Sequence, residues 1–155
     1  MRLEECVEIH APRTRVWAAI ADADRYRLFM AGLTRWDVKL GRAMRKGARI
    51  EMRMAVGSAQ VGSLIEVVEF DPPADLAWTS VTGIDQRGRW RLRARGEGCT
   101  RVTLRLAYQA PGGPAGWLAD RVAAPGVRAN LRRSLRALKE QVEPDGAPAP
   151  DRGGC

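Results

Sequence analysis

The spacing of hydrophobic residues changes along the chain, and this change predicts where helices and strands lie. Residues 3–9 carry apolar side chains on one face and polar side chains on the other, which is typical of a strand. Helical spacing follows in two short segments. Pro12 suits the first turn of the first helix, Asp24 is a candidate cap for the second, and Gly32 ends it. We therefore predict one strand followed by two short helices.

From Trp36 onward the hydrophobic period is two. Six strands are predicted, at residues 36–40, 50–56, 59–70, 76–82, 86–95 and 100–109. Gly57 and Ser58 form a plausible two-residue hairpin turn. The pair Pro72-Pro73 ends the long strand, because proline cannot donate to a central ladder. Strands in hairpin succession predict an antiparallel sheet, which can expose one face and bury the other.

Helical spacing returns after residues 110–114 and continues to about Val142. Its apolar stripe comprises Val127, Leu131, Leu135, Leu138 and Val142. The pair Pro125-Gly126 is expected to kink or split this helix. Residues 144–155 have nothing to bury and are expected to be disordered. The predicted organisation is a folded domain at residues 1–143 and a tail at residues 144–155.

Arginine occupies every second position of one strand, at residues 87, 89, 91, 93 and 95. Because side chains alternate across a strand, Trp90 and Leu92 must face the other way. We expect the arginines to face solvent, since burying five unpaired guanidinium groups is prohibitive. If the first and last strands pair, Glu4 and Glu8 would offset Arg101 and Arg105.

The formal net charge of the 155-residue chain is +8. A basic surface permits nucleic acid, anionic lipid or acidic protein as partners. Nucleic acid is disfavoured, because Trp90 and Tyr108 lie on the opposite face to the arginines and cannot stack on bases. The basic amphipathic terminal helix leaves transient membrane contact as an expectation. Whether the chain is a monomer or a homodimer stays open.

The cysteines and the single histidine show no metal-binding spacing, so no metal and no cofactor are expected. Cys6, Cys99 and Cys155 form no CxxC pair and are interpreted as reduced thiols. The N-terminus lacks the apolar core of a signal peptide, and no segment approaches the roughly 18 apolar residues of a membrane span. These features predict a cytoplasmic protein.

A sheet with one apolar face must be covered, and the terminal helix is the only long cover predicted. The residues between them either pack solidly or enclose a cavity, and both alternatives are open from the pattern. Ligand pockets usually measure about 300–1,000 Å³ and are mostly apolar.

Four sequence blocks resemble a known family. They are IHAPRTRVWAAIAD at residues 9–22, VVEFDPPADLAW at 67–78, RVTLRLAYQAPGG at 101–113 and LRRSLRALKEQVE at 131–143. Together they resemble the polyketide cyclase/dehydratase-like branch of the START-related (SRPBCC, helix-grip) superfamily over about residues 3–143. The resemblance implies an α+β fold, with a curved seven-stranded antiparallel sheet wrapped around a long C-terminal helix and two short helices between strands 1 and 2. It also implies a deep hydrophobic cavity between sheet and helix.

The pattern favours binding of a hydrophobic small molecule (a lipid, an isoprenoid or a polyketide-like compound) by a carrier or sensor. The residues predicted to line the site are Met52, Met54, Trp78, Ser80, Trp90, Leu92, Leu104, Leu106, Leu131, Ser134 and Leu135.

Catalysis would require a proton donor or acceptor in the cavity. Glu66 and Glu69 lie on opposite faces of one strand, where a bulge can move a residue to the other face, and Tyr108 offers a phenol at the cavity mouth. These three are the catalytic candidates for a polyketide cyclase/dehydratase-type enzyme, the first alternative. An interaction module that uses the basic surface is the second.

Overall fold

The computed structural model describes residues 1–39 and 43–144. Its elements are β1 (Arg2–Ile9), α1 (Arg13–Ile20), α2 (Ala23–Phe29), β2 (Leu33–Lys39), β3 (Arg49–Val56), β4 (Ala59–Asp71), β5 (Asp75–Gly83), β6 (Asp85–Ala94), β7 (Thr100–Gln109) and α3 (Gly113–Val142). The tail predicted to be disordered lies, apart from Pro144, outside the described residues.

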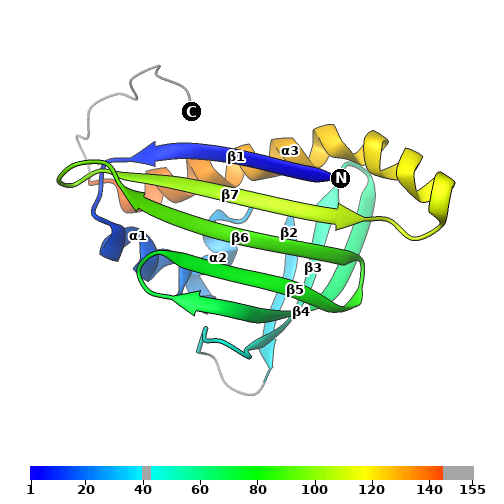
Figure 1. Cartoon of the computed structure of the whole chain (residues 1–155), viewed down its shortest axis with the longest axis horizontal. Coiled ribbons are helices and arrows are strands. Elements are labelled where there is room, and N and C mark those ends of the chain that lie inside the picture. Colours follow the sequence, from blue (N-terminus) through cyan, green and yellow to red (C-terminus); the bar gives the residue numbers. More distant parts are fainter. Residues whose placement is uncertain (40–42, 145–155) are drawn as a thin grey trace.

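The strands form one antiparallel seven-stranded sheet in the order β1-β7-β6-β5-β4-β3-β2. Consecutive strands from β2 to β7 are neighbours, and β1 closes the order by pairing with β7. Figure 1 shows α3 running along one side of the sheet beside β1 and β7, with α1 and α2 on the same side. This arrangement confirms the predicted helix-grip fold.

The side chains of the later strands alternate as predicted. Trp90, Leu92, Val102 and Leu104 are essentially inaccessible to solvent, and they belong to the same core cluster as the apolar stripe of α3. Burying an aliphatic side chain of this size stabilises the fold by about 1.5–3 kcal/mol relative to leaving it exposed. The hydrophobic core therefore lies between the sheet and α3.

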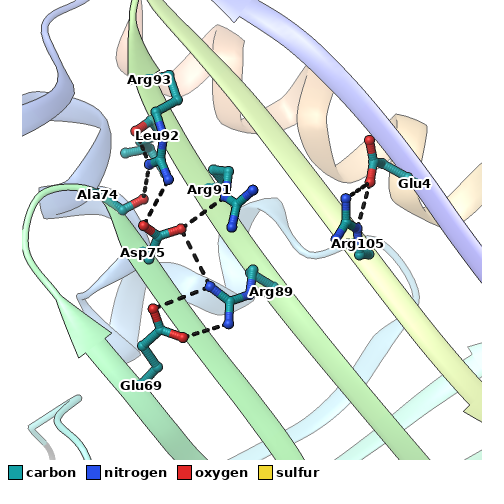
Figure 2. A network of polar contacts seen from close by, with 9 residues as sticks. All are labelled: Glu4, Glu69, Ala74, Asp75, Arg89, Arg91, Leu92, Arg93 and Arg105. Carbon is teal, nitrogen blue, oxygen red and sulfur yellow. Dashed lines mark hydrogen bonds and ion pairs between the residues drawn. The ribbon is translucent and has the colours of Figure 1, made fainter.

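On the outer face, three arginines of β6 share one carboxylate of β5 (Figure 2). Arg91 and Arg93 donate hydrogen bonds to Asp75, at 3.2 and 3.0 Å, and Arg89 lies 3.6 Å from it. Arg89 also forms a bidentate pair with Glu69 of β4, at 3.2 and 2.5 Å. The arginines face outward as expected, but three of them are paired with acidic neighbours.

The pairing of β1 with β7 places Glu4 opposite Arg105 and Glu8 opposite Arg101. Arg105 Nε donates to Glu4 at 2.6 Å, as Figure 2 shows. Glu5 has the opposite orientation. It accepts hydrogen bonds from Arg128 and Arg132 of α3, at 2.5 and 3.0 Å, and so fixes the helix to the first strand.

Of the kink or split expected at Pro125-Gly126, the split does not occur, because α3 is one continuous helix. Two other local expectations were wrong. The cap of α2 is Asp22, whose carboxylate accepts from the backbone N–H groups of Asp24 and Arg25 at 2.9 and 3.2 Å. Cys6 is disulfide-bonded, whereas Cys99 is a free thiol, so the cysteines give no argument for a reducing compartment.

None of the described helices combines the length and hydrophobicity needed to cross a bilayer. Within the described residues, no group of three or more histidine, cysteine or carboxylate side chains is arranged to hold a metal ion.

Candidate functional site

A cavity lies between the inner face of the sheet and α3. Its volume is about 40 Å³. This is enough for about three waters at 10–15 Å³ each. Its lining is formed by Tyr26, Met30, Ala31, Leu33, Trp36, Met52, Met54, Ile65, Trp78, Gln86, Leu104, Leu106, Val127, Asn130, Leu131 and Ser134. The cavity is where the resemblance implied, but it is much smaller than a deep ligand pocket, because aromatic side chains fill the space.

The position of Trp78 depends on a glycine in the neighbouring strand. Trp78 of β5 pairs with Gly88 of β6. A Cβ atom added to Gly88 would lie only 1.9 Å from Cζ2 of the indole. The ring therefore lies directly over the glycine, and the missing side chain makes the room that it needs.

A second aromatic group at the cavity is built around Tyr26 of α2. Its ring stacks on Trp36 of β2, with centroids 4.2 Å apart and an interplanar angle of 13°. Its hydroxyl oxygen accepts a hydrogen bond of 2.9 Å from the indole N–H of Trp90. Burial raises the pKa of Tyr26, which keeps the phenol neutral. This contact fixes α2 against the middle of the sheet.

The polar side chains contributed by α3 are used to hold the backbone. Ser134 Oγ donates to the carbonyl of Asn130 at 2.7 Å and accepts from the backbone N–H of Ala31 at 2.9 Å. Asn130 Nδ2 donates to the carbonyl of Ala55 at 3.0 Å. Both residues therefore fasten the helix to the segments around β2 and β3.

Gln86 is the polar residue that β6 contributes to the cavity. Its Nε2 donates to Ser63 Oγ at 2.6 Å and lies 3.6 Å from the sulfur of Met52. Ser63 Oγ is in turn 3.5 Å from the carbonyl of Ile84. The amide is therefore held in place by β4.

Two indole nitrogens remain without partners. Among the buried side-chain nitrogen and oxygen atoms of the described residues, only Trp36 Nε1 and Trp78 Nε1 have no hydrogen-bond partner. Both rings line the cavity. Buried polar groups are almost always paired in native proteins, so these two buried donors are exceptions.

The structure brings seven of the predicted ligand-site residues to the cavity: Met52, Met54, Trp78, Leu104, Leu106, Leu131 and Ser134. It places four outside the lining: Ser80, Trp90, Leu92 and Leu135. Trp90, Leu92 and Leu135 are fully packed core residues, with Trp90 occupied by its hydrogen bond to Tyr26. Ser80 Oγ accepts from the backbone N–H of Gln86 at 3.1 Å, which braces the turn between β5 and β6.

The three catalytic candidates lie away from the cavity lining. Glu66 pairs with Arg49 at 3.4 Å, and Glu69 pairs with Arg89 on the outer face. Tyr108 donates a hydrogen bond of 3.1 Å to the carbonyl of Asp120 in α3. Burial and the nearby Asp120 carboxylate raise the pKa of Tyr108. These placements give no support to acid–base chemistry by these groups in the cavity.

Sequence reasoning missed Gln86 and Trp36, although the signal for both was present. In β6, Gln86 lies four residues before Trp90, so strand alternation places both side chains on the same inner face. Trp36 occupies the apolar face of β2 in the same way. Tyr26 had no such signal, because nothing in a short helix shows which strand it will contact.

Comparison with known proteins agrees with this geometry. Residues 1–143 match the family model described as polyketide cyclase / dehydrase and lipid transport. The chain belongs to this family. A comparison with curated proteins found no match.

Several solved structures share the fold of this family member. One is the protein TTHA0849 from Thermus thermophilus, with 23% identity, a TM-score of 0.78 and coverage of 92% of this chain and 97% of that one. Another is the Zhui aromatase/cyclase from Streptomyces sp. R1128, with 17% identity, a TM-score of 0.76 and coverage of 92% and 93%. The major latex-like protein 151 of Panax ginseng has 14% identity, a TM-score of 0.66 and coverage of 93% and 98%. At these identities the likeness shows the fold alone.

Proposed function

We propose that this protein binds a hydrophobic small molecule between the sheet and α3, as a carrier or sensor. The observation that carries the proposal is the cavity itself, which is lined mainly by aromatic, aliphatic and methionine side chains. Membership of a family described by polyketide cyclisation, dehydration and lipid transport supports the same ligand class. A lipid, an isoprenoid and a polyketide-like compound all belong to this ligand class. We also propose a cytoplasmic location.

Binding requires the cavity to widen. Its 40 Å³ is far below the roughly 300–1,000 Å³ typical of ligand pockets. Met30, Met52 and Met54 all line it, and methionine adapts to new shapes because its side chain is unbranched and flexible. We expect these three side chains to change rotamer when a ligand enters, at the cost of the contacts they now make.

The neutral dye N-phenyl-1-naphthylamine tests the proposal, since its fluorescence rises in an apolar cavity. The wild-type chain should bind it with a saturable signal. Met54→Trp places a large ring in the cavity lining and should weaken binding at least tenfold. Val81→Trp is the matched control, because Val81 is 43% exposed and does not line the cavity. Equal binding by both variants would contradict the proposed site.

A cyclase/dehydratase-type enzyme is the alternative favoured by the family description. Replacing Glu66 and Glu69 together by glutamine separates the two roles. The carrier proposal expects dye affinity to stay unchanged in this double variant, because both carboxylates are engaged in ion pairs away from the cavity. If the wild type turns over a polyketide-like substrate and the double variant does not, the enzyme alternative is favoured.

Transient membrane contact is a second candidate role, and the start of α3 favours it. Trp117, Leu118 and Val122 are 60%, 59% and 77% exposed there. The guanidinium of Arg121 lies 4.7 Å from the centre of the Trp117 ring. Exposed aromatic and aliphatic side chains beside a cation suit an anionic bilayer surface.

Co-sedimentation with vesicles of phosphatidylcholine and phosphatidylglycerol tests this role. The double variant Trp117→Ala/Leu118→Ala should lower the bound fraction. Leu28→Ala removes a leucine from α2 that is 67% exposed, and it should leave the bound fraction unchanged. Equal losses in both variants, or no binding by the wild type, would remove this candidate.

A further inference from the structure

The cavity comes close to solvent at the end of the sheet where α3 begins. This inference rests on the proposed function, because it concerns how a ligand reaches the same cavity. In the antiparallel order, β2, β4 and β6 start at this end, and β3, β5 and β7 finish there. Partly exposed lining residues lie here: Leu33 pairs with Met54, Gln86 lies at the start of β6, and Leu106 lies near the end of β7. A ligand from solvent therefore has a short path into the cavity at this end.

The turn between β3 and β4 projects beyond the neighbouring strands at this end. The pairing of β2 with β3 begins at Met54, and the pairing of β5 with β4 begins at Ser63. Residues 55–62, the hairpin tip, are therefore a two-stranded ribbon, and residues 57–60 within it are exposed. A two-stranded ribbon alone is marginally stable, so the hairpin tip depends on what it contacts.

The hairpin tip contacts α3 beside the cavity, and Figure 1 shows this turn next to the helix. A Cβ atom added to Gly126 would lie 3.4 Å from Cγ1 of Val56 and 3.8 Å from the backbone nitrogen of Gly57. Val127, the next residue of the helix, lines the cavity. The contact at Gly126 therefore lies at the edge of the cavity wall.

One buried side chain of α3 fastens this contact. Asn130 Nδ2 donates to the carbonyl of Ala55 at 3.0 Å, and its Oδ1 accepts from Arg133. Gly32 lies against the same amide, because a Cβ atom added there would be 2.7 Å from Nδ2. The carbonyl of Gly32 also accepts from the N–H of Ala55 at 2.7 Å. The Asn130 amide therefore lies where the helix, the hairpin tip and the segment before β2 meet.

We propose that the hairpin tip and α3 form a gate through which the ligand enters, and that Asn130 is the clamp that holds it closed. Opening breaks the hydrogen bond between Asn130 and Ala55 and separates Val56 from Gly126. The amide and carbonyl groups that are released can both bond to water, so neither is left buried and unpaired. The closed gate explains why the cavity measures only about 40 Å³ and needs a movement before it admits a ligand.

The double variant Val56→Cys/Gly126→Cys tests the gate by locking it. The thiol sulfur at position 56 replaces a Cγ1 atom that is already 3.4 Å from the Cβ position of residue 126, which suits a disulfide. Cys99→Ser is the background, because it removes a free thiol that would compete. Stopped-flow fluorescence follows the uptake of N-phenyl-1-naphthylamine. Uptake should be at least tenfold slower in the oxidised form, and reduction should restore it.

The single variants Val56→Cys and Gly126→Cys are the matched controls, since each carries one substitution without the bond. Both should take up the dye at the wild-type rate, with or without reductant. Because reductant also acts on the disulfide of Cys6, the Cys99→Ser parent is measured under both conditions. Mass spectrometry after alkylation confirms the new bond.

Asn130→Asp tests the clamp. Aspartate keeps the shape of the side chain and an acceptor for Arg133, but it has no N–H group for the carbonyl of Ala55. Dye association and dissociation should both become about tenfold faster, as the loss of one hydrogen bond allows, with the affinity unchanged. A merely structural loss would lower the affinity instead. Gln60→Ala is the matched control, because it removes the exposed bond of 3.1 Å from Thr34 on the same hairpin tip and should leave both rates unchanged.

The outcomes separate this inference from the function it rests on. Uptake at the wild-type rate by the cross-linked chain would overturn the gate, and so would failure of the two thiols to pair. Unchanged rates in Asn130→Asp would overturn the clamp. In each of these cases dye binding by the wild type, and the proposed function with it, would stand. A wild-type chain that takes up no dye would overturn the proposed function together with the inference.

Discussion

At the scale of single residues, the pair formed by Trp78 and Gly88 controls the shape of the cavity. The indole occupies the space that a side chain at Gly88 would take. Glycine usually weakens a strand, so its use here is explained by the ring that covers it. The sequence places Trp78 and Gly88 in neighbouring strands, but only their register shows that they are directly opposite.

We predict that Gly88→Ala displaces the Trp78 ring and lowers the free energy of unfolding by about 1–3 kcal/mol through overpacking. Near-ultraviolet circular dichroism reports the ring, and urea unfolding reports the stability. Gly62→Ala is the matched control within the same sheet, because its added Cβ would have its nearest neighbour at 3.5 Å. A Gly88→Ala protein as stable as Gly62→Ala, with an unchanged aromatic spectrum, would show that Trp78 does not lie over Gly88.

The sequence predicted residues on the long inner-facing strands better than residues that depend on packing. Met52, Met54, Leu104 and Leu106 follow a strict alternation, and all four line the cavity. Trp90 has the correct face too, but it lies deeper, where Tyr26 occupies its N–H group. Alternation along a strand predicts which face of the sheet a side chain occupies. How deeply that side chain is buried depends on which helix covers it, and a local pattern does not contain that information.

At the scale of elements, three of the five alternating arginines on the outer face of the sheet are ion-paired with carboxylates. Asp75 has a side chain that is only 12% exposed, beneath Arg89, Arg91 and Arg93. The register places Asp75 opposite Arg91, so Arg89 and Arg93 flank it on the same face. This arrangement reduces the charge that β6 offers to an acidic partner, which disfavours the interaction-module alternative.

The Asp75 cluster has a consequence for stability against pH. Partial burial opposes ionisation of Asp75, but hydrogen bonds from Arg93 and Arg91 outweigh it and lower the pKa of the carboxyl. A pKa that is lower in the folded state stabilises the fold above the unfolded value of about 3.9. That contribution disappears as the pH falls through the folded pKa.

We predict that Asp75→Asn lowers the free energy of unfolding at pH 7 by about 1–2 kcal/mol and flattens its decline in acid. Urea unfolding between pH 7 and pH 2 measures both effects. Glu4→Gln removes the partner of Arg105, and the side chain of Glu4 is 49% exposed, so its loss should cost only about 0–1 kcal/mol. Identical pH profiles for wild type and Asp75→Asn would contradict the assigned role of Asp75.

At the scale of the whole molecule, the architecture followed from the sequence and the size of the cavity did not. Turn residues such as Gly57 and Pro72 divide the chain into strands in hairpin order, and the remaining amphipathic helix must cover the sheet. The volume left inside depends on how Tyr26, Trp36 and Trp78 pack against each other. Such packing joins elements that are far apart in the chain, so alternation within a strand cannot predict it.

The central claim is that a hydrophobic small molecule enters the space between the sheet and α3. Intermolecular nuclear Overhauser effects in the complex with N-phenyl-1-naphthylamine test it most directly, because they report which protein protons lie in close contact with the ligand. We predict contacts to the methyl groups of Leu104, Leu131 and Met52, which line the cavity. Contacts confined to Val81 on the exposed end of β5, or to Leu118 and Val122 on α3, would contradict the account.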